Sequence, residues 1–148
     1  MDCRNALKET NGDKAKAIEI LQKQGLIKAQ KSEGRVAKQG LVVSYIHGEG
    51  RIGALVEINC ETDFVARTAE FQELAHNVAM QVAAMAPEYL SKNDCPAGVE
   101  IDFQNTCLLL QPYIKDPTKT IQDIVTEIIA KTGENVVISR FARFELGK

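Results

Sequence analysis

Two short segments of alternating side chains constrain the fold more than any other feature of the sequence. Residues 41–46 and 52–58 each place successive side chains on opposite faces, and one face of the second segment is wholly apolar: Ile52, Ala54, Val56 and Ile58. A period of two is typical of β-strands. The glycines of His47-Gly48-Glu49-Gly50, between the segments, suit a tight turn. We therefore predict a β-hairpin whose second strand leads into a polar turn, Thr62-Asp63-Phe64-Val65.

Two helices and a last strand are predicted after this turn. From Thr68 to Pro87 the apolar residues recur at helical spacing, and Thr120 with Asp123 resembles a capping box for a helix that ends near Gly133. Residues 136–146 read as a strand, whereas residues 88–118 carry no clean period, although Leu108-Leu109-Leu110 could be a buried strand. Residues 40–148 thus form an α+β domain, an antiparallel sheet of about three strands covered by helices on one face.

Residues 1–39 predict a separate N-terminal helical module followed by a basic connector. A first helix spans residues 2–11, and Asp13 caps a second helix that Gly25 ends, with an inward face of Ala17, Ile18 and Leu21. Residues 26–40 are polar, basic and interrupted by glycine, as a linker is. Isolated helices shorter than about 12–15 residues barely form in water. Either a third helix precedes the pair, or the pair packs elsewhere.

Composition and charge narrow the class of protein. The chain has 148 residues and a net charge of −2, with +4 on residues 1–40 and −6 on the rest. No apolar run approaches the roughly 20 residues that cross a bilayer, and Met1-Asp2-Cys3 is no secretory start. We expect no membrane contact and a cytoplasmic location, or an organellar interior in a eukaryote. The basic end contains no aromatic residue, so we expect no direct nucleic-acid binding, and a solvated connector or a contact to an acidic protein surface instead.

Catalysis has no convincing candidate residues. The four cysteines form no CxxC pair, which favours reduced packing thiols over a metal site. His47, Cys60 and Asp63 suggest a base, a nucleophile and an acid, but the strand between His47 and Cys60 separates them by about 30 Å. A nucleophile and its base must approach to about 3 Å. We therefore predict no enzyme activity, no catalytic residue, no metal and no cofactor.

Phe64 admits two interpretations before its surroundings are considered. Apolar residues usually lie inside, so this ring could be the lid of the domain's own core. Because Asp63 and Arg67 flank it in a polar turn, it could instead enter a crevice on another protein.

Four blocks of residues resemble the elongation factor Ts family, the guanine-nucleotide exchange factors for elongation factor Tu. The signature is Asn59-Cys60-Glu61-Thr62-Asp63-Phe64-Val65-Ala66-Arg67. The supporting blocks are residues 1–15, which resemble the latter part of the family's ubiquitin-associated-like module, Ser44-Tyr45-Ile46-His47-Gly48, and Gly133-Glu134-Asn135 with residues 140–147. Relative to the family, the chain resembles a short single-core form that opens where the first helix would have ended and lacks a helical stretch between Gly98 and Leu108.

The resemblance implies a function through protein contact. In the family the Asp-Phe pair enters a crevice of the GTPase near its magnesium and phosphate site, which corresponds here to Asp63 and Phe64. The implied partner-binding residues are Thr62, Asp63, Phe64, Val65, His47, Gly133, Glu134 and Asn135, with Met1, Asp2 and Cys3 as the contact of the N-terminal module. Longer members carry two core copies, so we expect a homodimer in which Phe64 of one chain and His47 of the other face one GTPase.

Three functional readings follow. The leading one is a translation elongation factor that promotes GDP release from elongation factor Tu. The alternative is a ribosome- or RNA-associated structural module that uses the basic connector, and a remote third is a small enzyme that joins Cys60 and His47 across a dimer interface.

Overall fold

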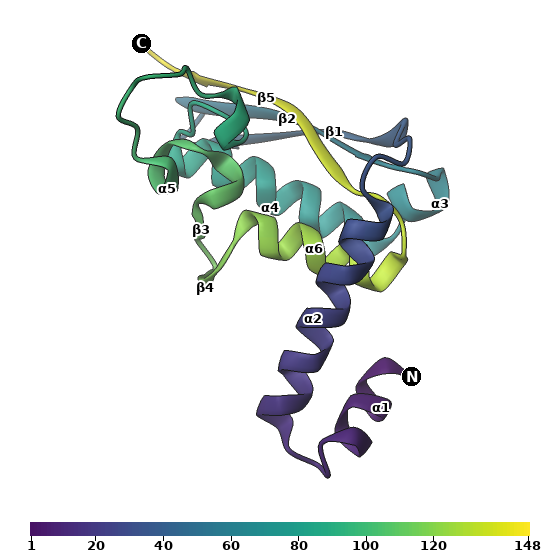
Figure 1. Ribbon diagram of the computed structural model, residues 1–148. Coiled ribbons are helices and arrows are strands. Elements are labelled where there is room, and N and C mark those ends of the chain that lie inside the picture. Colours follow the sequence, from purple (N-terminus) through teal and green to yellow (C-terminus); the bar gives the residue numbers. More distant parts are fainter.

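The computed structural model describes residues 1–148 (Figure 1). The elements, in chain order, are α1 (Asp2–Glu9), α2 (Lys14–Ser32), β1 (Gln39–His47), β2 (Ile52–Cys60), α3 (Asp63–Ala66), α4 (Ala69–Met85), the 3₁₀ turn η1 (Lys92–Asp94), α5 (Phe103–Thr106), the 3₁₀ turn η2 (Leu108–Leu110), β3 (Pro112–Tyr113), β4 (Asp116–Thr120), α6 (Ile121–Thr132) and β5 (Val137–Glu145). The α+β class is confirmed, with a helical part ahead of the sheet. None of the helices combines the length and apolar character needed to cross a membrane.

The main sheet has three antiparallel strands in the order β1-β2-β5. The predicted hairpin is confirmed, since β1 and β2 pair from His47 opposite Ile52 to Gln39 opposite Cys60. Strand β5 adds to the other edge of β2 and begins its pairing with Glu145 opposite Ile52. The apolar face of β2 is buried, as its alternation predicts.

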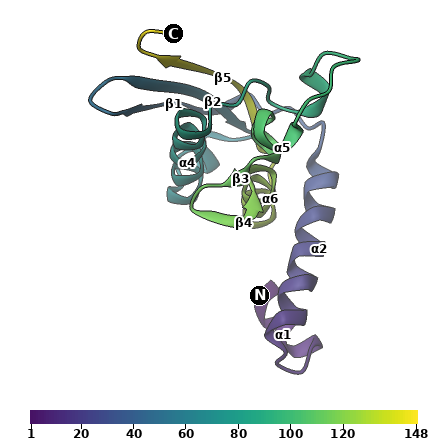
Figure 2. The same cartoon turned by 90° about the vertical axis from the view of Figure 1, so that its left-hand side faces the viewer.

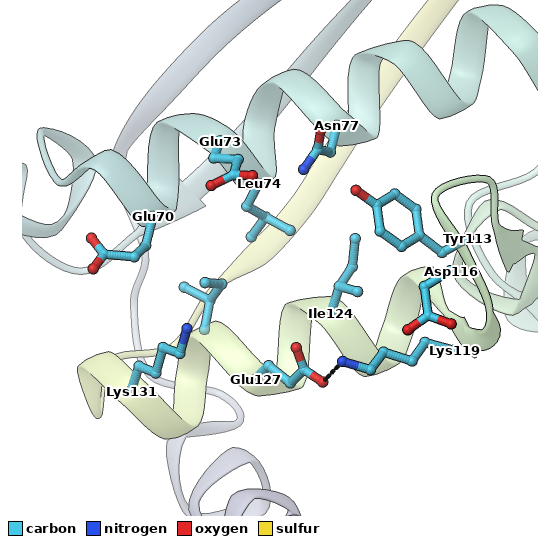
Figure 3. Close-up of a pocket in the computed structure, with 11 residues that line it drawn as sticks. Glu70, Glu73, Leu74, Asn77, Tyr113, Asp116, Lys119, Ile124, Glu127 and Lys131 are labelled. Atoms are coloured by element: carbon cyan, nitrogen blue, oxygen red, sulfur yellow. Dashed lines mark ion pairs between the residues drawn. The ribbon is translucent and has the colours of Figure 1, made fainter.

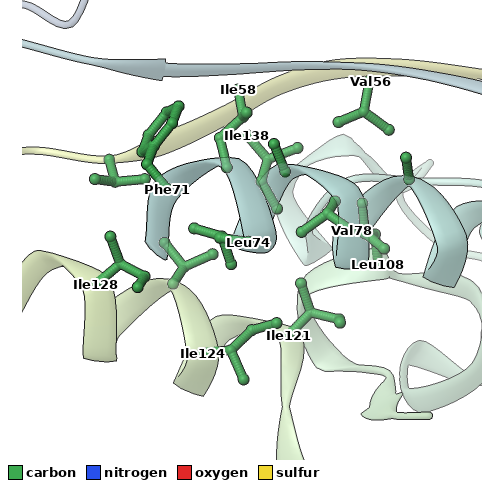
Figure 4. Packing of buried hydrophobic residues seen from close by; sticks show 14 of the residues in the cluster. Val56, Ile58, Phe71, Leu74, Val78, Leu108, Ile121, Ile124, Ile128 and Ile138 are labelled. Atoms are coloured by element: carbon green, nitrogen blue, oxygen red, sulfur yellow. The ribbon is translucent and has the colours of Figure 1, made fainter. Parts of the chain in front are cut away.

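The core lies between the inner face of this sheet and α4, and α6 lies below α4 (Figures 1 and 4). Phe71, Val78 and Val82 of α4 are fully buried, as the helical spacing predicts. Thr68 accepts the Phe71 N–H to cap α4, and the capping box of Thr120 with Asp123 starts α6. The order hairpin, helix, helix, strand is thus confirmed.

The N-terminal part differs from its prediction in two respects. Helix α2 continues through Gly25 to Ser32, so residues 26–32 are helical rather than linker. A Cβ at Gly25 would lie 3.3 Å from the Cβ of Ala130, so the glycine allows α2 to pack closely on α6. This contact outweighs glycine's poor helix propensity. Of the expected inward face, Ala17 is buried whereas Ile18 is exposed.

Helices α1 and α2 form an arm that extends away from the sheet (Figures 1 and 2). Lys28 lies where the arm meets the core, and its Nζ donates to the Ala130 carbonyl of α6 at 3.4 Å. Helix α2 therefore packs on α6, and α1 packs on α2. The boundary at residues 39 and 40 between two domains stays a prediction.

Residues 88–118 form short turns and a second sheet of two strands, β3 and β4. The suggestion of a strand at Leu108–Leu110 was wrong, because the segment is the 3₁₀ turn η2. The N–H of Gln111 donates to the carbonyls of Cys107 and Leu108 at 3.1 and 3.2 Å. The N–H groups of Leu108 and Leu109 donate to the carbonyls of Tyr89 and Leu90. The segment is therefore a turn that packs against residues 89–90 through one buried anchor, Leu108, rather than a strand.

Candidate functional site

The turn after β2 presents Phe64 to solvent. Thr62 is the N-cap of the four-residue helix α3, and its side chain accepts the N–H of Val65 at 3.4 Å. Within α3, Ala66 is buried, whereas the Phe64 side chain is 78% exposed. Phe64 is therefore not the lid of this domain's core, and of the two interpretations only the outward-facing ring remains.

Asp63 and Arg67 lie on either side of Phe64 in sequence and form an ion pair. The Asp63 Oδ2 and Arg67 Nη2 atoms are 2.8 Å apart, at the (i, i+4) spacing of one helical turn. Asp63 also stands in the first turn of α3, where a negative charge favours the helix. Such an exposed pair contributes only about 0.3–0.5 kcal/mol, so its main effect is to restrain the two side chains relative to each other.

Glu134 holds the turn from the far end of the chain. Gly133 ends α6 in the left-handed conformation, with φ of 71°, and thereby directs the next residue back toward β2. The Glu134 carboxylate accepts the hydroxyl of Thr62 at 2.6 Å and its N–H at 3.0 Å. It also accepts the N–H of Glu61 at 3.1 Å. Three hydrogen bonds to one carboxylate thus fix the backbone immediately before Phe64, and charge-assisted bonds are the stronger kind.

A second set of contacts runs through Glu61, Arg35 and Asn135. The Glu61 carboxylate accepts the N–H of Asn135 at 2.6 Å and lies 3.4 Å from Arg35 Nη1. Arg35 also donates to the Gly133 carbonyl at 3.1 Å, and Asn135 Nδ2 donates to the Arg35 carbonyl at 2.7 Å. The segment before β1, the turn after β2 and the turn after α6 are therefore tied together below the exposed ring.

Cys60 lies buried beneath the turn. Its side chain is fully buried, and its Sγ donates to the Thr62 carbonyl at 3.1 Å. Burial raises the pKa of the Cys60 thiol, and the nearby charge of Glu134 raises it further. A thiol held in its neutral form is a poor nucleophile.

His47 stands at the opposite end of the hairpin from Phe64. The strand register puts His47 opposite Ile52 and puts Cys60 opposite Gln39, so one full strand separates the two ends. The His47 ring stacks on Tyr45 with centroids 6.1 Å apart, and the Tyr45 hydroxyl lies 3.4 Å from His47 Nδ1. This placement agrees with the geometric argument against a His47 and Cys60 pair within one chain.

Met1, Asp2 and Cys3 begin α1 on the arm, away from the Phe64 turn (Figure 1). All three are exposed. The Asp2 carboxylate lies 3.0 Å from Lys28 Nζ, and this hydrogen bond, with the charge of Lys28, lowers the pKa of Asp2. Lys28 therefore joins α1 to α2 and α2 to α6.

A cavity of about 220 Å³ opens between α4 and α6 (Figure 3). Leu74 and Ile124 line it, with Glu73, Tyr113 and the ion pair of Lys119 with Glu127 around them. Ligand pockets usually measure about 300–1,000 Å³, so this one is small for an organic substrate. No three His, Cys, Asp or Glu side chains gather in a way that could hold a metal ion.

Arg35 and Glu61 are the site residues that the sequence reading did not select. Arg35 falls within the predicted basic connector, and Glu61 stands in the signature block without a role of its own. The hairpin itself carries the signal, since pairing Gln39 with Cys60 brings residues just before β1 beside those just after β2. Opposite charges at these two ends could have indicated the contact.

Comparison with known proteins identifies the family. A family model described as "Elongation factor TS" matches residues 14–101. The whole chain is 48% identical to "Elongation factor Ts" of Moorella thermoacetica and 47% identical to that of Thermotoga maritima, each over 88% of the relative. It is 49% identical to the protein of the same name from Carboxydothermus hydrogenoformans, over 82% of that relative.

The alignments also agree with the expected loss of an internal stretch. The alignment with the Moorella thermoacetica protein spans 178 residues, against 148 in this chain, so about 30 residues of the relative have no counterpart here. The family match, the identity over the full chain and the residues of the Phe64 turn all agree. The chain therefore belongs to the elongation factor Ts family and is a translation elongation factor.

Proposed function

We propose that this chain promotes the release of GDP from elongation factor Tu by inserting the ring of Phe64, beside Asp63, near the magnesium and phosphate site of that GTPase. The observation that carries the proposal is a large apolar ring, 78% exposed, on a turn fixed by hydrogen bonds from two other segments. An aromatic side chain that buries itself in a partner's pocket is the usual form of a binding hot spot.

The fixed turn favours this mechanism energetically. Binding is weakened by the ordering of loops and side chains at an interface. Because Glu134 and Glu61 already order the backbone around Thr62, little further ordering is needed when the ring enters the partner. The binding free energy then remains available to displace the groups that hold the nucleotide.

The mechanism requires no covalent chemistry. If the factor weakens nucleotide binding, the nucleotide must weaken binding of the factor by the same ratio. The chain then acts as an exchange factor without a catalytic residue or a cofactor. In this scheme Thr62, Val65, Gly133, Glu134 and Asn135 position and surround the ring, and Asp63 sets its orientation.

The arm supplies a second contact in this proposal. Met1, Asp2 and Cys3 are exposed at the start of α1, which projects from the core (Figure 2). Residues 1–39 then form a module that holds the partner, and residues 40–148 form the core that performs exchange. We place this function where translation takes place, in the cytoplasm or in an organellar interior.

We propose further that two chains pair through the outer face of the sheet. Val42, Ile46 and Leu55 on this face are exposed, and Phe144 is 76% exposed. The register brings Ile46 and Phe144 to opposite sides of Gly53, so these apolar side chains are contiguous. Large exposed apolar patches mark interaction sites.

A two-fold axis between two such sheets, at right angles to the strands, would place His47 of one chain near the Phe64 end of its partner. Each half of the site would then come from a different chain. Size-exclusion chromatography with light scattering tests this directly: we expect a dimer that Leu55→Glu dissociates. A strict monomer, both alone and in the complex with the GTPase, would exclude the pairing.

The exchange function itself is tested by the release of labelled GDP from purified elongation factor Tu. We expect release to accelerate in proportion to the added chain. A ribosome- or RNA-associated module, the alternative, would leave release unchanged and would bind RNA with an affinity that falls steeply as salt rises.

A further inference from the structure

Two cysteines outside the Phe64 turn lie in direct contact. The Sγ atoms of Cys95 and Cys107 are 3.5 Å apart, although 12 positions separate the two residues along the chain. Cys95 directly follows η1 and is partly exposed, whereas Cys107 directly precedes η2 and is fully buried. One thiol of the pair can thus be reached from solvent while the other is held behind it.

The backbone on the Cys95 side is held by η1. The N–H of Ser91 donates to the Asp94 carboxylate at 2.8 Å, and the Ser91 hydroxyl donates to the same oxygen at 2.7 Å. The N–H of Cys95 donates to the Lys92 carbonyl at 3.2 Å. These bonds fix the position from which the Cys95 side chain approaches its neighbour.

The backbone on the Cys107 side is held by α5 and by Tyr89. The N–H of Cys107 donates to the Phe103 carbonyl at 3.0 Å, and the N–H of Leu108 donates to the Tyr89 carbonyl at 2.9 Å. Cys107 and Tyr89 also form an isolated parallel β-bridge. Both sulfur atoms are therefore carried by ordered backbone.

The remaining two cysteines have no such neighbour. Cys3 is exposed at the start of α1, and Cys60 is buried under the Phe64 turn with its Sγ on the Thr62 carbonyl. The chain thus contains one pair of thiols in contact, and the pairing of Cys95 with Cys107 competes with no other within the molecule.

We propose that Cys95 and Cys107 form a reversible disulfide that ties the loop of residues 95–107 to the core. A disulfide needs its sulfur atoms about 2.05 Å apart, so the two Sγ atoms must approach from their present 3.5 Å. The side chains already point at each other, so this approach needs a small change in side-chain torsion and no exchange of partners. The oxidant is a low-molecular-weight disulfide, such as glutathione disulfide.

The reaction proceeds in two balanced exchange steps. The Cys95 thiol loses its proton to solvent, and its thiolate attacks one sulfur of glutathione disulfide, which releases one glutathione thiolate. The Cys107 thiolate then attacks the Cys95 sulfur of the mixed disulfide and releases the second glutathione. Two protein thiols are oxidised, one disulfide is reduced to two thiols, and the protons lost by the cysteines match those gained by glutathione.

The rate of the first step should depend strongly on pH. Burial and the hydrogen bond to Cys107 raise the pKa of Cys95 to about 11. The thiolate is the attacking form, so below this pKa its population rises about tenfold for each unit of pH. The pair should therefore oxidise slowly near neutral pH and much faster at pH 9.

The cross-link would close a loop that lies partly at the surface. Within residues 95–107, Val99 is exposed, and the centroid of the Phe103 ring lies 5.3 Å from Lys92 Nζ. The loop also coincides with the region, between Gly98 and Leu108, where the family resemblance places the missing helical stretch. A disulfide here restricts the unfolded chain and so raises the temperature of unfolding.

The full-length chain, oxidised in a glutathione buffer at pH 8.5 and then alkylated, tests the proposal by peptide mapping. Trypsin leaves both cysteines in the peptide of residues 93–115. In the oxidised chain the mass of this peptide should be lower than that of its reduced form by the mass of two hydrogen atoms. Cleavage after Glu100 should then give two pieces that separate only on reduction. Thermal unfolding of the oxidised chain should occur about 5–10 °C above that of the reduced chain.

Two variants serve as controls. Cys95→Ser, at the partly exposed position, should remove both the linked peptide and the thermal shift, whereas Cys3→Ser should keep both. An oxidised wild-type chain with free thiols at residues 95 and 107, or with those residues joined only to glutathione, would overturn the proposal. So would a thermal shift of the same size in Cys95→Ser.

Discussion

The carboxylate of Glu134 accepts both the hydroxyl and the N–H of Thr62, at 2.6 and 3.0 Å, although 72 positions separate the two residues. Thr62 immediately precedes the Asp63-Phe64 pair and caps the short helix that carries it. The orientation of the exposed ring therefore depends on a residue from the other end of the core.

We predict that Glu134→Gln lowers the rate of GDP release from elongation factor Tu, although the Phe64 side chain itself is unchanged. Glutamine keeps the size of the side chain but carries no charge, and its amide group cannot accept from two N–H groups and a hydroxyl as the carboxylate does. Hydrogen bonds to charged groups contribute about 1.5–3 kcal/mol each when buried, so a loss of about 1–3 kcal/mol in stability is expected for this partly buried set. Urea unfolding and GDP release measure the two effects.

Glu127→Gln is the matched control for Glu134→Gln. Glu127 lies on α6, the helix that ends just before Glu134, and pairs with Lys119 at 2.6 Å rather than with the Phe64 turn. This variant should exchange nucleotide like the wild type. Equal activity of Glu134→Gln and the wild type would show that the ring does not need this support.

We predict that Gln81→Leu strongly destabilises the core. The buried Gln81 side chain donates to Gln111 Oε1 at 3.2 Å and to the Pro112 carbonyl at 3.1 Å, and it accepts the Ile114 N–H at 3.0 Å. Leucine would leave these groups without partners, which costs about 1–3 kcal/mol for each buried polar group. Urea denaturation should show a loss of about 2–4 kcal/mol, against less than about 0.5 kcal/mol for the exposed Gln122→Leu. An unchanged midpoint for Gln81→Leu would contradict this role.

We predict that the arm loosens in acid through the pair of Asp2 with Lys28. Lys28 lowers the pKa of Asp2, first by its hydrogen bond and then by its charge. Because the pKa of Asp2 is lower in the folded chain, its ionisation stabilises the fold at pH values above about 3.9, the pKa in the unfolded chain. This stabilisation is lost as the pH falls through the pKa of the folded chain. The protection of the α1 amides against exchange, relative to the intrinsic exchange rate at each pH, should therefore fall below about pH 4.

Asp2→Asn isolates this effect from other acid-sensitive pairs. Asparagine has no charge to lose, so α1 should exchange faster than in the wild type at pH 7, and the two proteins should converge as the pH falls. If the exchange rates of α1 in Asp2→Asn and in the wild type differed by the same factor at every pH, Lys28 would not hold α1 through Asp2.

The core could be predicted from local patterns because each of its elements has a strong period and clear ends. The alternation of residues 52–58, the stripe from Phe71 to Val82 and the capping box at Thr120 all agree with the structure. The sheet buries one face and each helix buries one stripe of side chains, so the buried positions recur at regular intervals along the sequence.

The errors arise where tertiary contacts decide the local structure. Gly25 reads as a helix end, but its missing side chain lets α2 reach Ala130 on α6. Leu108–Leu110 reads as a strand, but it is a 3₁₀ turn whose first two N–H groups bond to the carbonyls of Tyr89 and Leu90. In the same way Arg35 and Glu61 act across segments, and no period along the chain could show their pairing.

The most direct test compares Phe64→Ala and wild type in the release of labelled GDP from elongation factor Tu. Because Phe64 is exposed, the free energy of unfolding of Phe64→Ala should lie within about 0.5 kcal/mol of the wild-type value. Phe71→Ala in the core should lose about 3–5 kcal/mol of that free energy. We predict that the Phe64→Ala chain is folded but loses about 2 kcal/mol or more of coupling to nucleotide, a roughly thirtyfold or larger loss of exchange. A folded variant that releases GDP as fast as wild type would contradict it.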